Sequence, residues 1–174
     1  MTQLTSKVCV VGDFAVGKTS VVERFVTNHF SEKYLSTVGV KIDTKEIEQP
    51  AFDVTHKLVV WDVAGSDSFG DREFAYLRGA SGYIYVADGT RSLTVKSVET
   101  IQSQIGDKFG AAPSVLLVNK RDLAAEWELS EERFESVGAS FDGAFRTSAK
   151  TGDDVDVAFA RLAQLIVENE LRGK

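Results

Sequence analysis

Short runs of apolar residues alternate along the chain with stretches in which apolar residues recur every three or four positions. The apolar runs predict strands, and some are nearly continuous, such as Val115-Leu116-Leu117-Val118, which is typical of parallel strands covered on both faces. The expected strands span residues 8–11, 40–47, 57–62, 83–88 and 115–119, with a weaker one at 144–147.

The stretches with helical spacing predict helices between these strands. The positions that recur at this spacing are Val22, Phe25, Val26 and His29; then Val98, Ile101, Ile105 and Phe109; and finally the apolar stripe of Val155, Ala158, Phe159, Leu162, Ala163 and Ile166. Strands that alternate with helices favour an α/β fold with a mostly parallel sheet and helices on both faces. Residues 49–56 contain proline and aspartate and suit an antiparallel hairpin. We expect one domain over residues 1–174, with a six-stranded mostly parallel sheet, one antiparallel edge strand and about five helices.

Composition narrows the function classes. The 174 residues are 43% hydrophobic and 26% charged, with a net charge of −6, which excludes the basic footprint usual for nucleic-acid binding. No stretch approaches the length of a membrane helix, and the N-terminus has no signal-peptide pattern. The single cysteine cannot form an internal disulfide, and none lies near the end of the chain to carry a prenyl group. We therefore expect a cytoplasmic monomer, with membrane association only through a lipidated tail that these residues lack.

Residues 12–19 read Gly-Asp-Phe-Ala-Val-Gly-Lys-Thr and lie between an expected strand and an expected helix. Gly12 and Gly17 let the backbone wrap closely enough to aim its N–H groups at phosphate oxygens. Lys18 supplies a positive charge for the terminal phosphates, and Thr19 offers a hydroxyl to Mg²⁺. The helix that begins here turns the positive end of its dipole toward the anion. The pattern predicts a loop that binds nucleotide phosphates.

The segment Asn119-Lys120-Arg121-Asp122 follows the fifth expected strand, at the edge where open α/β sheets bind ligands. The Asp122 carboxylate can accept from the N1–H and the amino group of guanine together, whereas adenine has no N1–H. Ser148-Ala149-Lys150 follows the sixth strand and is expected to close over the base with a backbone N–H. These segments favour a guanine nucleotide.

With these motifs, the sequence resembles the Ras superfamily of small GTPases, and within it the Rab group. The resemblance covers nearly the whole chain, and its motifs occur in family order. They are the phosphate loop, Tyr34-Leu35-Ser36-Thr37-Val38-Gly39-Val40, Trp61-Asp62-Val63-Ala64-Gly65, Arg78-Gly79-Ala80, and residues 119–122 and 147–150. The resemblance implies the P-loop NTPase fold of small G proteins, Mg²⁺ as the metal with GTP or GDP, and hydrolysis of GTP.

The resemblance also implies roles for single residues. Phe30 is expected against the guanine, Asp62 on the metal through water, and Thr37 on both Mg²⁺ and the γ-phosphate. Gly65 is expected to offer its N–H to the γ-phosphate, so that only GTP holds both switch loops ordered. The expected metal set is Thr19, Thr37 and Asp62, and the expected catalytic set is Lys18, Thr37, Gly65 and Ser66. The nucleotide-contacting residues are expected to include Asp13, Phe14, Ala15, Val16, Ser20, Tyr34, Asn119, Lys120, Ser148, Ala149 and Lys150.

A partner surface follows from the same resemblance. Val38, Val40, Trp61 and Tyr76 are expected to bind an effector protein in the GTP state only, and Ile42 occupies a position that is aromatic in Rab proteins. By composition alone, Trp61 and Tyr76 are equally suited to core packing. An exchange factor and a GTPase-activating protein are the other partners that the resemblance implies.

Two positions depart from the family pattern. Ser66 stands where a glutamine normally orients the attacking water, and a serine hydroxyl is too short to span the same distance. Phe14 stands where relatives have glycine or a small residue. Two orientations of its ring stay open: one near the γ-phosphate, where it obstructs a partner's arginine, and one toward solvent.

Two classes of function therefore remain. In the first, the protein is a switch that hydrolyses GTP slowly, in line with the intact Thr37, Asp62 and Gly65. In the second, it is a GTP-binding interaction module with little or no hydrolysis, which Ser66 and Phe14 favour. A nucleotide kinase is disfavoured because Asp122 selects guanine and no acceptor-binding insertion is visible.

Overall fold

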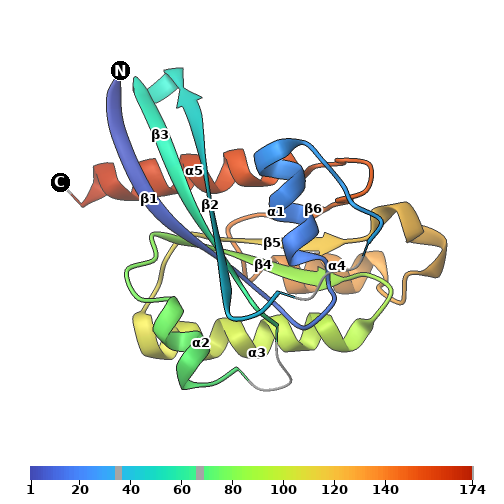
Figure 1. Ribbon diagram of the computed structural model, residues 1–174. Coiled ribbons are helices and arrows are strands. Elements are labelled where there is room, and N and C mark those ends of the chain that lie inside the picture. The colour runs from blue at the N-terminus through green and yellow to red at the C-terminus, as the bar shows by residue number, and fades with distance from the viewer. Residues whose placement is uncertain (34–36, 66–68, 174) are drawn as a thin grey trace.

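The computed structural model describes residues 1–33, 37–65 and 69–173, which form a six-stranded sheet between two layers of helices (Figure 1). The strands lie in the order β2-β3-β1-β4-β5-β6. Only β2 runs antiparallel, on β3, while the other neighbours pair in parallel. The prediction of a mostly parallel sheet with one antiparallel edge strand is confirmed. The strands are β1 (Thr2–Val11), β2 (Val40–Gln49), β3 (Val54–Val63), β4 (Gly82–Asp88), β5 (Ser114–Asn119) and β6 (Ala144–Arg146).

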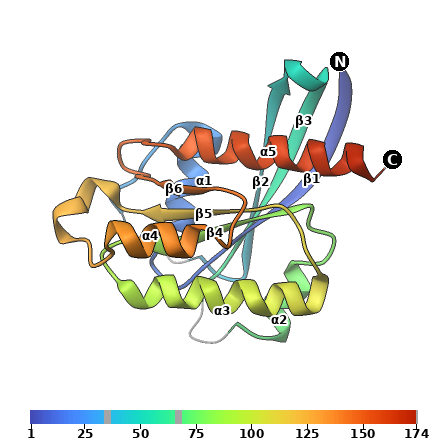
Figure 2. The same ribbon diagram turned by 180° about the vertical axis from the view of Figure 1, so that it is seen from behind.

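Helices cover both faces of the sheet, as Figures 1 and 2 show from opposite sides. On one face α1 packs beside α5, where the rings of Phe25 and Phe159 stack with centroids 3.9 Å apart. On the other face α3 and α4 bury Val98, Ile101 and Phe134 against the sheet. The helices are α1 (Lys18–Thr27), α2 (Asp71–Tyr76), α3 (Ser92–Phe109), α4 (Glu131–Gly138) and α5 (Val155–Arg172), with 3-10 turns η1 (Pro50–Phe52) and η2 (Arg121–Glu126).

The end of α1 differs from the sequence expectation. The helix stops at Thr27, before His29, because Asn28 adopts a left-handed conformation with φ 55° and its N–H caps the Arg24 carbonyl. His29 therefore belongs to the connection between α1 and β2, where it lines a cavity described below.

The sheet also extends further than the apolar runs predict. β1 begins at Thr2 rather than at residue 8, and pairs with β3 from Thr2 opposite Val54. The early half of β1 is polar, but it includes Ser6, which is buried against His56 of β3. The His56 Nε2 atom lies 2.8 Å from Ser6 Oγ, and Nδ1 lies 2.7 Å from Gln49 Oε1. Burial lowers the pKa of His56 below its ordinary value.

The parallel strands bring their carboxyl ends to one edge of the sheet. β1 leads there into the loop at residues 12–17, β3 ends beside Asp62, and β5 ends at Asn119. The segment after β6 reaches the same edge, because the Thr147 N–H donates to the Val118 carbonyl at 2.8 Å. This edge is where ligands bind in open α/β sheets.

Candidate nucleotide and metal site

The loop at residues 12–17 has a backbone that only glycine fits at its two ends. Gly12 has φ 152°, and a Cβ there would lie 2.2 Å from the Val86 carbonyl oxygen in the central strand β4. Gly17 has φ 100°, and its Cβ would lie 2.3 Å from Asn119 Nδ2. Ala15 between them also has a positive φ, of 62°. The loop is thus held tightly against two strand ends, in the wrapped form that aims N–H groups at an anion.

Lys18 opens α1 and turns its side chain back over this loop. Its Nζ donates to the carbonyl oxygens of Gly12 at 3.0 Å and Asp13 at 2.7 Å. Burial lowers the pKa of Lys18 to about 8, although the nearby carboxylates of Asp62 and Asp13 act in the opposite direction and raise it. The ammonium lies where an anion cradled by the loop would meet it.

Three oxygen-bearing side chains converge beside Lys18. The Thr19 hydroxyl is hydrogen-bonded to the Thr37 hydroxyl and donates to Asp62 Oδ2 at 2.5 Å. Asp62 is fully buried, and its Oδ1 is the one buried side-chain oxygen or nitrogen of the described residues without a hydrogen-bond partner. Burial raises the pKa of Asp62, while the Thr19 hydroxyl and Lys18 lower it. Hydroxyl and carboxylate oxygens are ligands that suit Mg²⁺, so the donor set and the orphaned Oδ1 fit that ion.

Asn119 links the loop at residues 12–17 to the segment that follows β6. This side chain is buried, and its Nδ2 donates to the Val16 carbonyl at 3.1 Å. Its Oδ1 accepts from Thr147 Oγ1 at 3.2 Å and from the Ala149 N–H at 3.3 Å. One amide thereby joins the loops that follow β1, β5 and β6.

Lys120 and Asp122 extend from the same strand end. The Lys120 ammonium donates to the Ala15 carbonyl at 3.2 Å and pairs with Asp88 Oδ2 at 2.9 Å. Asp122 Oδ1 accepts from Ser148 Oγ at 2.7 Å. This bond orients one carboxylate oxygen of Asp122.

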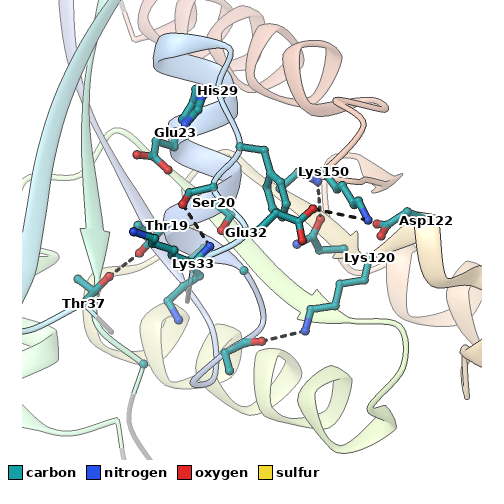
Figure 3. A pocket seen from close by; sticks show the side chains of 18 of the residues that line it. Thr19, Ser20, Glu23, His29, Glu32, Lys33, Thr37, Lys120, Asp122 and Lys150 are labelled. Carbon is teal, nitrogen blue, oxygen red and sulfur yellow. Dashed lines mark hydrogen bonds and ion pairs between the residues drawn. The ribbon is translucent and has the colours of Figure 1, made fainter. Parts of the chain in front are cut away.

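A cavity of about 700 Å³ unites these groups, which is the size of an ordinary small-molecule site. Figure 3 shows Thr19 and Thr37 reaching toward each other at one side of it, and Asp122 and Lys120 at the other. The sequence-predicted residues that line it are Phe14, Ala15, Gly17, Lys18, Thr19, Ser20, Phe30, Thr37, Gly65, Asn119, Lys120, Asp122, Ala149 and Lys150.

The remaining predicted residues either lie behind the residues that line the cavity or fall outside the described ranges. Gly12, Asp13, Val16, Asp62 and Ser148 support the lining residues through the contacts given above. Tyr34 and Ser66 fall outside the described residues. Sequence reasoning missed several lining residues, most of them in the segment after α1 or facing it: Glu23, His29, Ser31, Glu32, Lys33, Lys41 and Leu123.

Comparison with known proteins decides the family. A sequence profile described as the Ras family matches residues 7–168. The chain belongs to the Ras family. Among curated relatives, Ras-related protein Rab-13 of Rattus norvegicus is 36% identical over 165 residues, covering 92% of this chain and 79% of that protein. Ras-related protein Rab-32A of Dictyostelium discoideum is 36% identical over 95% of this chain and 80% of its own length. Ras-related protein Rab-7L1 of Homo sapiens is 32% identical over 94% and 83%, respectively.

The protein is therefore a Rab-like member of the Ras family, whose members are GTP-binding switch GTPases that generally use Mg²⁺ with the bound nucleotide. Thr37 and Gly65, which the resemblance places in two switch segments, both line the cavity. The two segments meet directly, because the Ala64 N–H donates to the Gly39 carbonyl at 2.9 Å, one step beyond the paired Val40 and Val63. A Cβ on Gly65 would lie 2.5 Å from the Phe14 nitrogen, so the second segment also touches the phosphate loop.

Phe14 lies at the rim of the site in this Ras-family chain. Its side chain lines the cavity and is still 49% exposed. Its carbonyl accepts from Arg91 Nη2 at 3.0 Å, and the same guanidinium pairs with Asp88 through Nε at 3.1 Å. The ring therefore stands at the cavity mouth while the backbone beneath it is fixed from β4.

Asp88 is a supporting residue that sequence reasoning missed. It is fully buried at the end of β4, where burial would raise the pKa of its carboxyl. Hydrogen bonds from Thr90, Lys120 and Arg91 outweigh that effect and hold the pKa below its ordinary value. A signal existed in the sequence, because Asp88 ends an apolar run just as Asp62 and Asn119 do.

The residues of the predicted partner face lie near one another on and around β2 and β3, and their binding of an effector stays a prediction. Val38 is 90% exposed, and Ile42 pairs across the sheet with Trp61. The Lys7 ammonium lies 3.6 Å from the centroid of the Trp61 ring. Val40 and Tyr76 are half-buried nearby, with Gly39 close enough that a Cβ there would lie 3.4 Å from the Tyr76 hydroxyl.

None of the helices in the described ranges is both long enough and apolar enough to cross a membrane.

Proposed function

We propose that this protein binds GDP and GTP in the 700 Å³ cavity and acts as a switch through the segments at Thr37 and Gly65. The observation that carries the proposal is the pairing, within one cavity, of a phosphate cradle at Lys18 with the Asp122 carboxylate. A nucleotide is a ligand with an anionic end and a base end, so it matches both groups at once. Phe30 lines the same cavity and supplies an apolar surface for the base.

The phosphate end binds charge in three ways. Lys18 gives the terminal phosphates a desolvated ammonium, the loop gives them backbone N–H groups, and α1 gives them its positive dipole end. Thr19 and Thr37 would hold Mg²⁺ by their hydroxyls, and Asp62 would hold it through water. When bound, this ion neutralises the charge of the phosphate oxygens.

The switch follows from the position of Thr37 and Gly65. Both line the phosphate end of the cavity, and each belongs to a segment that a γ-phosphate would hold in place. In the GDP state the γ-phosphate is missing, so the contacts that hold both segments are lost. Effectors that bind around Val38 and Trp61 would then distinguish the two states, with an exchange factor and a GTPase-activating protein as regulators.

We propose further that hydrolysis of GTP to GDP and phosphate is slow. Phosphoryl transfer in this family depends on positioning and charge stabilisation, since the protein does little covalent chemistry. Lys18 and the loop N–H groups still supply charge stabilisation, so turnover is retained. Ser66 supplies no side chain long enough to hold the attacking water in line, and a misplacement of about 1 Å can cost about a hundredfold in rate.

The decisive experiment concerns the base. Asp122→Asn should weaken GDP binding by about 2–4 kcal/mol, because an amide cannot accept both guanine donors. It should improve the relative affinity for xanthosine diphosphate, whose C2 carbonyl accepts from the new amide. Calorimetric titration of both nucleotides measures this exchange.

A matched control is Glu126→Gln, which changes an exposed carboxylate in the same turn, η2, outside the cavity lining. It should bind GDP as the wild type does. Equal GDP affinity of the wild type and Asp122→Asn would refute the assignment of Asp122 to the base.

A further inference from the structure

Trp127 lies directly behind the segment that reads the base. It follows η2, and its indole Nε1 donates to the Lys120 carbonyl at 2.7 Å. The same carbonyl accepts from the Leu123 N–H at 2.9 Å, so two donors fix one peptide group. Lys120 has φ 73°, a left-handed conformation that is uncommon for a residue with a Cβ. The Lys120 backbone is therefore held in an unusual conformation by contacts from the segment that follows it.

The indole ring is itself fixed in place by Gly89 at the end of β4. A Cβ on Gly89 would lie 2.2 Å from Trp127 Cε2, so any larger residue there would displace the ring. The next residue is also held: the Glu128 N–H donates to the Gly89 carbonyl at 2.9 Å, and the Glu128 carboxylate accepts from the Ser92 N–H at 2.8 Å. Trp127 is thus anchored on the central sheet and not merely laid over a loop.

We propose that Trp127 is a positioning residue for guanine recognition: it sets the backbone of Lys120 and, through it, the place of Asp122. The inference rests on the proposed function, because it assigns to Trp127 the alignment of the carboxylate that reads the base. The Lys120 ammonium also contacts the Ala15 carbonyl and Asp88, so the side chain and the backbone of Lys120 are held by separate partners. A rigid indole with a fixed N–H suits this task, since a hydrogen bond loses strength steeply with angle.

The test compares GDP with inosine diphosphate, which lacks the C2 amino group of guanine and so makes one contact fewer with Asp122. Trp127→Phe keeps a ring and removes the N–H. We expect it to release GDP about fivefold faster, as the loss of one hydrogen bond predicts, and to lower the preference for GDP over inosine diphosphate. Trp127→Leu should enlarge both effects. Gly89→Ala should reproduce them by displacing the ring, and should add nothing further in a Trp127→Leu background.

Leu129→Ala is the control for packing. Leu129 packs on the same core as Trp127, and its side chain has no donor for Lys120. With GDP in excess, Leu129→Ala should lower the midpoint of thermal unfolding and leave the preference between the two nucleotides unchanged.

The outcomes separate this inference from the proposed function. If the wild type prefers GDP and both Trp127 variants keep that preference and the wild-type release rate, the role of Trp127 is refuted while Asp122 still reads the base. If Leu129→Ala loses the preference as strongly as Trp127→Leu, the effect is one of packing and the inference fails. If the wild type does not prefer GDP at all, the base assignment fails and the inference fails with it.

Discussion

Replacement of Asn119 by alanine would remove the side chain that joins three loops of the nucleotide site. Asn119 is only 2% exposed and takes part in three hydrogen bonds, with the Val16 carbonyl, the Thr147 hydroxyl and the Ala149 N–H. A buried hydrogen bond contributes about 1 kcal/mol net, and a partner left unpaired costs more. The bonds to Thr147 and Ala149 are long, at 3.2 and 3.3 Å, so we expect a total loss of about 2–4 kcal/mol.

This loss should appear mainly as faster nucleotide release. In the proposed function Val16 belongs to the loop that binds the phosphates and Ala149 lines the base end, so we expect the amide to hold both walls in the arrangement that binds the nucleotide. A loss of about 2–4 kcal/mol corresponds to release about thirty- to seven-hundredfold faster. Displacement of a fluorescent GDP analogue by excess GDP measures the rate directly.

Thr147→Val serves as the comparison variant, because it keeps the shape of the side chain and removes only one of the three bonds. Its release rate should rise by no more than about fivefold. A release rate for Asn119→Ala that equals that of Thr147→Val would show that the amide does not hold the two walls together, and the reasoning would be wrong.

Chelation of Mg²⁺ with EDTA should speed GDP release; an unchanged rate would contradict the metal assignment. Ser66→Gln should raise the single-turnover rate of GTP hydrolysis, more so when Phe14 is also replaced by glycine, and a wild-type rate at or above that of Ser66→Gln would mean that another group positions the water. Val38→Glu should abolish capture of effectors by GTP-analogue-loaded protein without changing GDP affinity, and recovery of the same partners from GDP-loaded and GTP-loaded wild type would contradict the partner face. Because burial lowers the pKa of His56, the unfolded state binds more protons, so stability should fall as the pH drops below about 6.5. Denaturant unfolding across that range should show a flatter pH dependence for His56→Gln, and identical slopes would exclude His56 as the cause.

The sequence predicted the elements that bury apolar residues, since burial is what a hydrophobic pattern records. The apolar stripes predicted α3 and α5, whereas α2 buries no residue and α4 buries only Phe134 and Val137. Such short helices carry too few apolar positions to form a period. The early part of β1 was missed for a related reason: its stability comes from pairing with β3 and from polar contacts such as that of Ser6 with His56.

For the candidate site, too, the sequence predicted what a local pattern records and missed what depends on contacts between distant stretches. The sequence predicted the cavity-lining residues that lie within contiguous motifs, because glycine, lysine and hydroxyl side chains at this spacing indicate phosphate binding. Arg91, paired with Asp88 at the end of β4, donates to the Phe14 carbonyl, and the Trp127 indole donates to the Lys120 carbonyl. Such contacts depend on where two distant stretches meet in space, which local spacing does not record.

The bond from the Ala64 N–H to the Gly39 carbonyl joins the two proposed switch segments at one point. It lies two residues after Thr37 on one side and one residue before Gly65 on the other, at the end of an unbroken ladder between β2 and β3. Deuterium uptake at the Ala64 amide should therefore report on both segments together, since neither can move away from this point without opening the bond. We therefore expect the exchange rate of this one backbone amide to record the nucleotide state without an attached dye and without any effector.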